Sequence, residues 1–311
     1  GTHAVSGVVS GAGSGRMLVS SGNVNASGSN VFGGELEVSG GTLDVAGTFG
    51  TTAFTLSGGT RSGAGTLSSS NGTWTAGAFT GVGTTTFGGN LAISGGTLRT
   101  LVDGHTLANT GTVTWTNVNT GNRGLIQSGS GAVINNSGTW LDQTTFAIGI
   151  DNAYGGATAN FNNAGSFVKT GASTTTIGIA FNNSGSVDVQ NGWLALSGGG
   201  SHTGSFDVAA GAGVAVLVGF DVAVGAGVAV CISLLTACPS PVHFARGDRR
   251  DVQGRGREIG ASQSCRSVVV RKDQAQRLPG YHDGLVLRPV PSVLRDHHRH
   301  GSRGRPPAGC H

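Results

Sequence analysis

The sequence predicts an all-β protein in which short strands stack as successive coils of a β-solenoid. Three observations lead to this prediction: a composition rich in glycine and poor in charge, a twelve-residue unit that recurs, and an Asn-Gly corner that recurs in phase with apolar residues. Gly accounts for 58 of 311 residues, and only 11% are charged, against roughly 25% in an ordinary globular domain. Thr, Val, Ser and Asn suit short strands joined by tight turns.

Helices are disfavoured because no window places apolar residues at helical spacing, and each Gly inside a helix costs about 1 kcal/mol. A flat sandwich or a propeller is a closer alternative. Propeller blades repeat at about 40 to 50 residues, which is longer than most of the spacings found in this chain. The repeat length therefore favours a solenoid.

The first repeated unit lies in the N-terminal half. FGGELEVSGGTL at residues 32–43 recurs as FGGNLAISGGTL at 87–98, with nine of twelve positions identical and an offset of 55. FTLSGGT at 54–60 is a partial copy, 18 residues after the first SGGT. Because 55 is close to three times 18, we expect coils of about 18 to 20 residues in this half.

Alternation within the unit predicts which side chains face the core. Leu36 and Val38 flank Glu37, and after the Gly-Gly corner Leu43 and Val45 resume the pattern. This is the period of two expected for a half-buried strand. Glycine suits the corner because it reaches positive φ without steric cost.

A different corner, Asn-small-Gly, recurs from residue 109 onward at spacings of 27, 27 and 20. The four copies are Asn109-Thr110-Gly111, Asn136-Ser137-Gly138, Asn163-Ala164-Gly165 and Asn183-Ser184-Gly185. Each Gly is followed by Thr or Ser and then by a larger apolar residue: Val113, Trp140, Phe167 or Val187. Asn tolerates left-handed backbone geometry, and stacked Asn side chains can form a hydrogen-bonded ladder. We therefore expect an Asn ladder along one corner of the solenoid.

The two ends of the repeat region are less regular. The first thirty residues read either as poorly specified strands or as a frayed end. DVAAGAGVAV at 207–216 recurs as DVAVGAGVAV at 221–230, which we interpret as one or two terminal coils. A membrane helix is the alternative for this apolar run, but Asp221 inside the run and the high Gly content argue against it.

Composition changes abruptly at Cys231, so we divide the chain into a solenoid domain at 1–230 and a tail at 231–311. All seven prolines and all four cysteines lie in the tail. The solenoid domain carries five basic and nine acidic residues, a net charge of −4, whereas the tail carries fourteen and six, a net charge of +8. The overall +4 describes neither part, so it does not predict a nucleic-acid partner. The tail lacks strand alternation and is predicted to be non-repetitive and disordered.

Several motifs in the tail suggest chemistry, but each has a plainer explanation. Arg246-Gly247-Asp248 matches an integrin-type tripeptide in a segment rich in those residues. The histidines at 297, 298 and 300 have no framework to fix metal geometry, and the four cysteines show no CxxC pairing or zinc spacing. Leu235-Thr236-Ala237-Cys238 resembles a lipoprotein processing box only near a true N-terminus. No signal peptide follows Gly1, so any secretion signal is expected outside this sequence.

In the solenoid domain, four polar groups deserve inspection for catalysis: Asp103, His105, Asp142 and Asp151. Surface positions on solenoid loops explain all four, and the calcium-binding nonapeptide of some β-helices is missing. We therefore predict no catalytic, cofactor-binding or metal-ligating residue and no cofactor.

The tryptophans and threonines of the domain suggest two kinds of binding face. Trp74, Trp115, Trp140 and Trp193 could form a sugar-stacking face, although Trp140 occupies an inward position. Ice binding would need Thr-x-Thr in every coil, and the motifs at 84–86 and 174–176 do not recur at coil spacing in the sequence.

Runs such as FNNAGSFVKTG at 161–171 and LAISGGTL at 91–98 resemble the large bacterial β-strand-repeat surface proteins, akin to filamentous-haemagglutinin and autotransporter-passenger adhesins. The resemblance covers about residues 32–213 and is lost in the tail, where further coils would be expected. It implies a right-handed parallel β-helix, extracellular or cell-surface localisation, and an adhesive or spacer stalk. Its implied partners are host or surface glycans or proteins, or other surface repeats, without membrane insertion. The family shares no catalytic residues, so none is carried over.

The rival function is a polysaccharide-degrading or carbohydrate-binding β-helix similar to pectate lyases and polygalacturonases. Such enzymes cluster carboxylates and basic residues on one face. The acids and bases of residues 1–230 are instead scattered along the sequence, without an Asp-Asp pair or an Asn-Thr-Asp motif. The sequence therefore favours a structural and adhesive role.

The composition of the tail leads to a genomic prediction. Four scattered cysteines together with dense Arg and His are uncommon in natural linkers, and they favour out-of-frame translation of a GC-rich repeat gene. We expect resequencing of the locus to reveal a frameshift or a misplaced gene end near codon 231. An intact frame, with the same tail encoded by homologous genes, would reject this hypothesis.

Overall fold

The computed structural model describes residues 1–117 and 125–216. The chain divides into two compact units, Gly1–Val269 and Val270–His311, and every described residue belongs to the first. Those residues form 27 β-strands and no helix. Consequently no helix in this part of the chain is long and apolar enough to cross a membrane.

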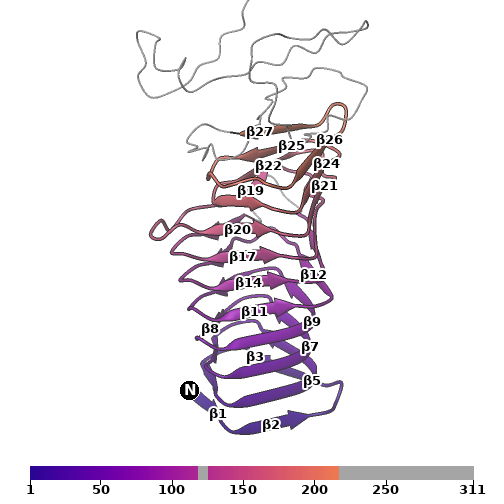
Figure 1. Ribbon diagram of the computed structural model, residues 1–311. Helices are drawn as coiled ribbons and strands as arrows, with labels where there is room; N and C mark the ends of the chain where they lie inside the picture. Colours follow the sequence, from indigo (N-terminus) through magenta and orange to yellow (C-terminus); the bar gives the residue numbers. More distant parts are fainter. Residues whose placement is uncertain (118–124, 217–311) are drawn as a thin grey trace, which may run out of the picture. The chain divides into compact units, whose positions relative to one another are not determined.

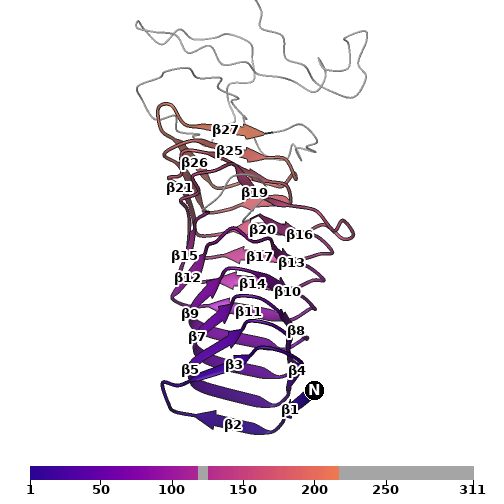
Figure 2. The same cartoon turned by 180° about the vertical axis from the view of Figure 1, so that it is seen from behind.

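All strands pair in parallel with strands of neighbouring coils, which confirms the predicted β-solenoid (Figure 1). One sheet of 11 strands forms the side of each coil that we call face a (Figure 2). From the first coil to the last, face a contains β1 (Thr2–Val5), β4 (Asn23–Ala26), β6 (Thr42–Val45), β8 (Thr60–Ser62), β10 (Gly77–Phe79), β13 (Arg99–Leu101), β16 (Ile126–Ser128), β19 (Ile148–Asp151), β22 (Thr174–Ile177), β25 (Trp193–Leu196) and β27 (Gly213–Val216).

The second sheet has 16 strands and bends along a corner into two sides, face b and face c. Face b holds β2 (Val8–Gly11), β11 (Thr84–Phe87), β14 (Thr106–Asn109), β17 (Val133–Asn136), β20 (Asn160–Asn163) and β23 (Ala180–Asn183). Face c holds β3 (Arg16–Val19), β12 (Asn90–Ile93), β15 (Thr112–Trp115), β18 (Thr139–Asp142), β21 (Ser166–Lys169), β24 (Ser186–Val189) and β26 (Ser205–Val208). Three long strands run through the corner and belong to both faces: β5 (Ser29–Val38), β7 (Thr48–Leu56) and β9 (Thr66–Trp74).

The strand register confirms the predicted coil length in the N-terminal half. Phe32 pairs with Thr51, Thr51 with Ser69 and Ser69 with Phe87, so the two copies of the unit lie three coils apart. Alternation along the strands places Leu36 and Val38 in the core with no exposed surface, whereas Glu37 points outward. The repeat therefore encodes one coil geometry that is reused with little change.

The Gly-Gly corner is also confirmed, and the stacking leaves no space for a side chain there. Gly41 has a φ of +65°, and a Cβ atom at this position would lie 2.4 Å from the carbonyl oxygen of Gly22 in the preceding coil. Successive coils approach so closely at this corner that only glycine satisfies both the backbone angle and the contact.

The second copy of the unit departs from the first at its end. Leu43 is fully buried on β6, but its sequence counterpart Leu98 is 44% exposed. The inward position is taken by Arg99, which is fully buried, and Leu101 rather than Leu98 continues the file of Leu43. Identical letters thus adopt different structures because a buried arginine follows them.

The irregular ends of the repeat region resolve into strands. Residues 2–26 form β1 to β4, so the first thirty residues are coils rather than a frayed end. The first copy of the duplicated run supplies the end of β26 and all of β27, as predicted for terminal coils. The second copy, the predicted boundary at 230/231 and the tail at 231–311 lie outside the described residues.

The predicted Asn ladder runs along the corner between faces b and c. Asn109, Asn136, Asn163 and Asn183 pair in register, and each is about 1% exposed. The Nδ2 atom of each residue donates to the Oδ1 atom of the next at 2.7, 2.7 and 2.8 Å, and Asn183 closes the series by donating to the carbonyl oxygen of Ser205. The apolar residues after each corner, Val113, Trp140, Phe167 and Val187, fill the core beside the ladder.

Breaking the ladder at its centre is expected to destabilise the solenoid. Asn136→Ala removes the acceptor of Asn109 and the donors to Asn163 and to the carbonyl oxygen of Ser166, and buried groups left without partners cost about 1–3 kcal/mol. Urea denaturation of the full chain measures this loss.

The neighbouring Asn135 provides a matched control, because it lies on the same strand but faces solvent and accepts one bond from Asn162. Asn135→Ala should change the free energy of unfolding by about 0.5 kcal/mol or less. Equal effects of the two substitutions would show that the buried ladder has no special role in stability.

Candidate functional site

The structure separates the four polar residues that the sequence singled out. Asp103 and His105 lie in the turn between β13 and β14, Asp142 ends β18, and Asp151 ends β19. None of the four forms a hydrogen bond with another of them in the described region. They therefore do not assemble into a single catalytic group, and each has to be considered in its own surroundings.

Asp103 is an exposed turn residue. Its φ of +60° and the +75° of Gly104 define a left-handed turn, which Asp tolerates better than most residues. Its Oδ2 atom accepts a hydrogen bond of 2.6 Å from the Thr80 hydroxyl in the preceding coil. The expected surface role on a solenoid loop fits this geometry.

His105, in contrast, is completely buried, which corrects its interpretation as a loop surface residue. Its ring stacks on Phe79 with centroids 5.3 Å apart. The Nδ1 atom lies 3.2 Å from the carbonyl oxygens of Thr80 and Gly81, and Nε2 lies 3.1 Å from the Thr85 hydroxyl. Because carbonyl oxygens only accept, Nδ1 carries the proton and Nε2 accepts from Thr85.

Burial lowers the pKa of His105 to about 4. The positive charge of Arg61 acts in the same direction, and the hydrogen bonds to the carbonyls of Thr80 and Gly81 oppose it. His105 is therefore neutral at physiological pH and joins two coils through uncharged hydrogen bonds.

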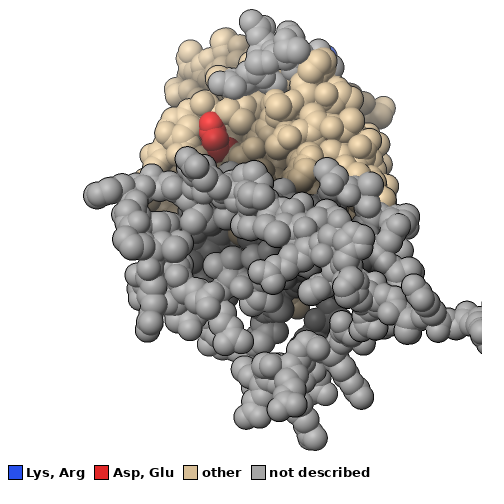
Figure 3. All heavy atoms as spheres, turned by 90° about the horizontal axis from the view of Figure 1, so that it is seen from above, with Lys and Arg blue, Asp and Glu red and all other residues tan. Residues whose placement is uncertain are grey.

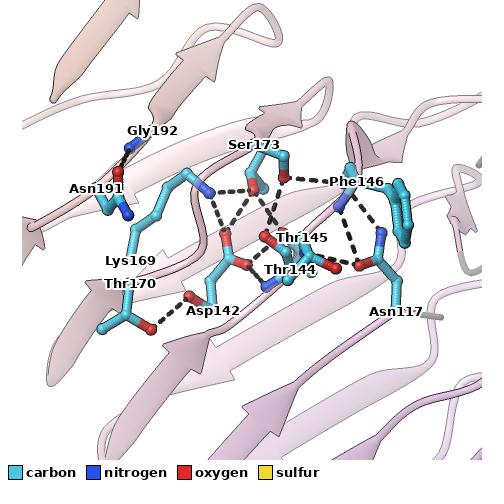
Figure 4. Close-up of polar contacts among 11 residues, drawn as sticks. Asn117, Asp142, Thr144, Thr145, Phe146, Lys169, Thr170, Ser173, Asn191 and Gly192 are labelled. Carbon is cyan, nitrogen blue, oxygen red and sulfur yellow. Dashed lines mark hydrogen bonds and ion pairs between the residues drawn. The ribbon is translucent and has the colours of Figure 1, made fainter. Parts of the chain in front are cut away.

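Asp142 is also buried rather than exposed, and it anchors a polar cluster inside the solenoid (Figure 4). Its Oδ1 atom accepts from the backbone amide and the hydroxyl of Thr144 at 3.0 and 2.7 Å. Its Oδ2 atom accepts from the Thr175 hydroxyl at 2.5 Å and lies 3.3 Å from Nζ of Lys169. Lys169 donates as well to the Thr175 hydroxyl at 2.9 Å, so residues from two successive coils share one network.

The charges of this pair stabilise each other inside the core. Asp142 and Lys169 have no exposed side-chain surface. Burial lowers the pKa of Lys169, and the Asp142 carboxylate opposes that effect. With both oxygens of the carboxylate bonded and the ammonium held beside it, the cluster has no free nucleophile or base, and its geometry fits a cross-link between coils.

The sequence contained a signal for Lys169 that residue type concealed. In Ser166–Lys169 the buried Phe167 fixes the inward phase, and Lys169 two positions later shares it. The same alternation places Asp142 two residues after the buried Trp140. Phase alone therefore predicts both positions as inward, whereas their charges suggest the surface.

Two more buried cations were missed by sequence reasoning. Arg61 on β8 donates to the carbonyl oxygens of Gly65 and Thr84 at 2.6 and 3.1 Å. Arg99 on β13 donates to the carbonyl oxygen of Trp74 at 3.0 Å and to that of Ser94. Burial lowers the pKa of each to about 10, so both remain charged and bind carbonyl oxygens at corners of the solenoid.

Asp151 lines an open groove of about 390 Å³, at which this candidate site is centred. The groove lies over β19 and β22 and is lined by Leu125, Ala147, Ile148, Gly149, Ile150, Asp151, Thr176, Gly178 and Ser197. Burial raises the pKa of Asp151, and backbone amides including that of Ala153 oppose the rise. Thr176 and Ser197 add hydroxyls to an otherwise apolar lining, which suits hydrogen bonding to a small neutral polar ligand.

The groove has one carboxyl group rather than two. Glycoside hydrolysis ordinarily uses a pair of carboxyl groups on either side of the scissile bond. The inward neighbour of Thr176 is Thr175, which is committed to the Asp142 cluster on the other side of β22. The lining can therefore orient a ligand, and it lacks the second acid that this chemistry requires.

The four tryptophans do not form a common face. Trp74, Trp115 and Trp140 are fully buried, and Trp115 and Trp140 meet edge to face with centroids 6.0 Å apart. Trp193 is 41% exposed on face a, where it pairs with Thr174. The core role expected for Trp140 is confirmed and extends to two others, leaving one ring to contact a ligand.

Several sequence candidates lie outside the described residues: the RGD tripeptide at 246–248, the box at 235–238, the histidine cluster at 296–300 and the four cysteines. Within residues 1–117 and 125–216, no three His, Cys, Asp or Glu side chains gather to hold a metal ion.

No protein-family model, curated protein or solved structure matches this chain.

Removing the cation of the buried pair is expected to destabilise the protein strongly. Lys169→Met leaves the Asp142 carboxylate buried without a counter-charge, at a cost of about 3–5 kcal/mol. The double variant Asp142→Asn/Lys169→Met should recover a large part of that loss, because no buried charge remains. Urea unfolding of the two single variants and the double variant completes a double-mutant cycle, and additive effects would contradict the pairing.

The buried His105 predicts a loss of stability in mild acid. Its pKa is about 4 in the folded chain and about 6.5 when unfolded, so between these values only the unfolded chain takes up the proton. Stability should therefore fall as pH decreases from about 6.5 to about 4, by about 3 kcal/mol in total.

Urea unfolding at pH 7 and at pH 4.5 measures this loss. His105→Gln does not titrate and should lose much less stability over the same interval. Parallel curves for the two proteins would assign the acid sensitivity to other groups.

Proposed function

We propose that the described coils form part of a structural and adhesive stalk of a larger bacterial repeat protein that is secreted or displayed at the cell surface. The observation that carries this proposal is the use of buried polar side chains as links between coils. The Asn ladder, the Asp142–Lys169 pair and His105 each join residues of different coils. Polar groups placed in this way favour a role in which the stack itself is the functional object.

A stalk benefits from bonds directed along the stacking direction. In a solenoid each coil contacts only its neighbours, so cohesion is a sum of coil-to-coil interfaces. The ladder adds a continuous series of side-chain hydrogen bonds from Asn109 to the carbonyl oxygen of Ser205. This series reinforces the C-terminal coils, where insertions lengthen the chain path per coil to as much as 27 residues.

The proposed partners are glycans or proteins of a host or surface, or other surface repeats. The outer faces offer regularly spaced hydroxyl and amide groups, and the exposed Trp193 offers one aromatic ring. We include neither nucleic acid nor membrane insertion among the proposed interactions, since the predicted charge of residues 1–230 is negative.

The alternative function is carbohydrate binding or degradation. The specific observation in its favour is the groove with Asp151, whose carboxyl group has a raised pKa in a lining of hydroxyls and apolar residues. Such a carboxyl group can act as a general acid if a second group is supplied.

A single experiment separates the two functions. The full chain is applied to an array of glycans and extracellular proteins and, in parallel, to a panel of acidic polysaccharides with reducing-end detection. We expect binding to the array without turnover. Turnover that Asp151→Asn abolishes, and that the exposed control Asp103→Asn preserves, would replace the stalk with an enzyme.

A further inference from the structure

Face b differs from the other two faces in having no charged side chain on its described strands. Its outward positions are occupied by Ser, Thr, Val, Gly, Ala and Asn. The solvent-facing charges of the described strands lie instead on face c, at Arg16, Glu35, Glu37, Asp188 and Asp207, and on face a, at Asp44 and Asp151. Viewed from above, the visible described surface is likewise mostly uncharged, with one acidic patch (Figure 3).

A file of threonines runs up the N-terminal part of this face. Thr48 pairs with Thr66, Thr66 with Thr84 and Thr84 with Thr106. These four residues are directly stacked in four successive coils, and Ser29 precedes them. The sequence expectation that Thr84 does not recur at coil spacing is therefore wrong, because unequal coil lengths conceal the register. Thr86 does not recur, since Ser68 and Ala108 flank it.

The hydroxyl groups of this file are available to a ligand. No hydrogen bond among the described residues uses the Oγ1 atom of Thr48, Thr66, Thr84 or Thr106. Outward hydroxyls on the other faces are often engaged, as Thr55 is by Glu35 and Ser62 by Asp44. Face b thus presents free hydroxyls beside methyl groups.

The file is held on a regular support. The pairing from β7 to β14 on this face shows no register shift, and β11, β14, β17 and β20 lie one above another (Figure 1). Parallel strands fix the spacing at about 4.8 Å between coils and about 6.7 Å between alternate residues of one strand. The second file, Gly50, Ser68, Thr86 and Ala108, consists of small residues, so nothing large projects beside the threonines.

These features restrict the chemistry of a partner. Protein interfaces concentrate their binding energy in aromatic residues and arginine, and neither type points outward on this file. The face also lacks the aromatic rings on which sugars stack, since Phe87, Phe161 and Phe181 are buried. A neutral, periodic array of hydroxyl and methyl groups instead matches a neutral, periodic ligand that accepts and donates hydrogen bonds.

We propose that the Thr48–Thr66–Thr84–Thr106 file of face b adsorbs to ice. The ice surface is an uncharged lattice of oxygen atoms whose hydrogen-bonding positions recur at intervals of similar size. The methyl groups order the adjacent water, and the free hydroxyls anchor it at the spacing of the coils. This activity goes beyond the stalk function and does not depend on it, so either can fail without the other.

Thermal hysteresis and inhibition of ice recrystallisation by the full chain test the proposal. We expect the wild-type chain to show both. Thr66→Lys/Thr84→Lys places charges that must lose hydration against ice, so activity should fall about tenfold or more. Thr112→Lys/Thr139→Lys is the matched control, because these threonines face outward on adjacent coils of face c and pair in register. The control should retain wild-type activity.

Further measurements keep each outcome decisive. If circular dichroism shows that the lysine variant is unfolded, Thr66→Val/Thr84→Val preserves the β-branched shape and removes only the hydroxyls, and it should still lose activity. Absence of ice activity in the folded wild-type chain would overturn the proposal. So would equal loss in the face c control, or binding of face b to a neutral glycan or to a second copy in sedimentation instead of to ice.

Discussion

The fold depends on parallel stacking in register, which gives every inward position a partner directly above and below it. A coil of about 20 residues cannot bury its own apolar face, so it is stable only against its neighbours. The same constraint applies to polar residues. An inward Asn, Asp or His has to find its hydrogen bonds on an adjacent coil, because water is excluded and an unpaired buried group is costly. Cohesion and polar satisfaction are therefore the same requirement in this molecule.

This requirement explains why the polar interior changes character along the chain. In the first coils, β5, β7 and β9 run through the corner as continuous strands, and no side-chain ladder is needed. From Asn109 onward the strands break at that corner, and the backbone groups freed by each break lie beside the Asn side chains. Asn109 accepts from the amide of Gly111 and donates to the carbonyl oxygen of Thr139. The ladder thus replaces backbone continuity with side-chain hydrogen bonds.

The same logic separates what could be predicted from the sequence from what could not. Fold class, coil length and ladder follow from local patterns, because alternation and corner motifs are short-range signals that repetition amplifies. The buried Asp142, Lys169, Arg61 and His105 were not predicted, since residue type outweighed the phase of the strand in which each lies. The groove at Asp151 was also beyond prediction, because it depends on which residues of β19 and β22 lie side by side after coils of unequal length. The threonine file was missed for that reason too: stacking register, rather than sequence spacing, decides which side chains form a surface.

The interior and the exterior therefore use repetition in opposite ways. Inside, a residue that breaks the apolar pattern is tolerated only where a neighbouring coil completes its bonding, as Thr175 and Lys169 do for Asp142. Outside, no such completion is required, so unbonded side chains such as the stacked threonines accumulate at the period of the coils. A surface of this kind is specified by the scaffold more than by any single residue. One substitution removes one element of the array, whereas a change in coil length would shift every threonine beyond it out of register. Selection on such a face would act on insertions as strongly as on residue type, and the insertions of this chain enter only after Thr84, in the coils that follow β11.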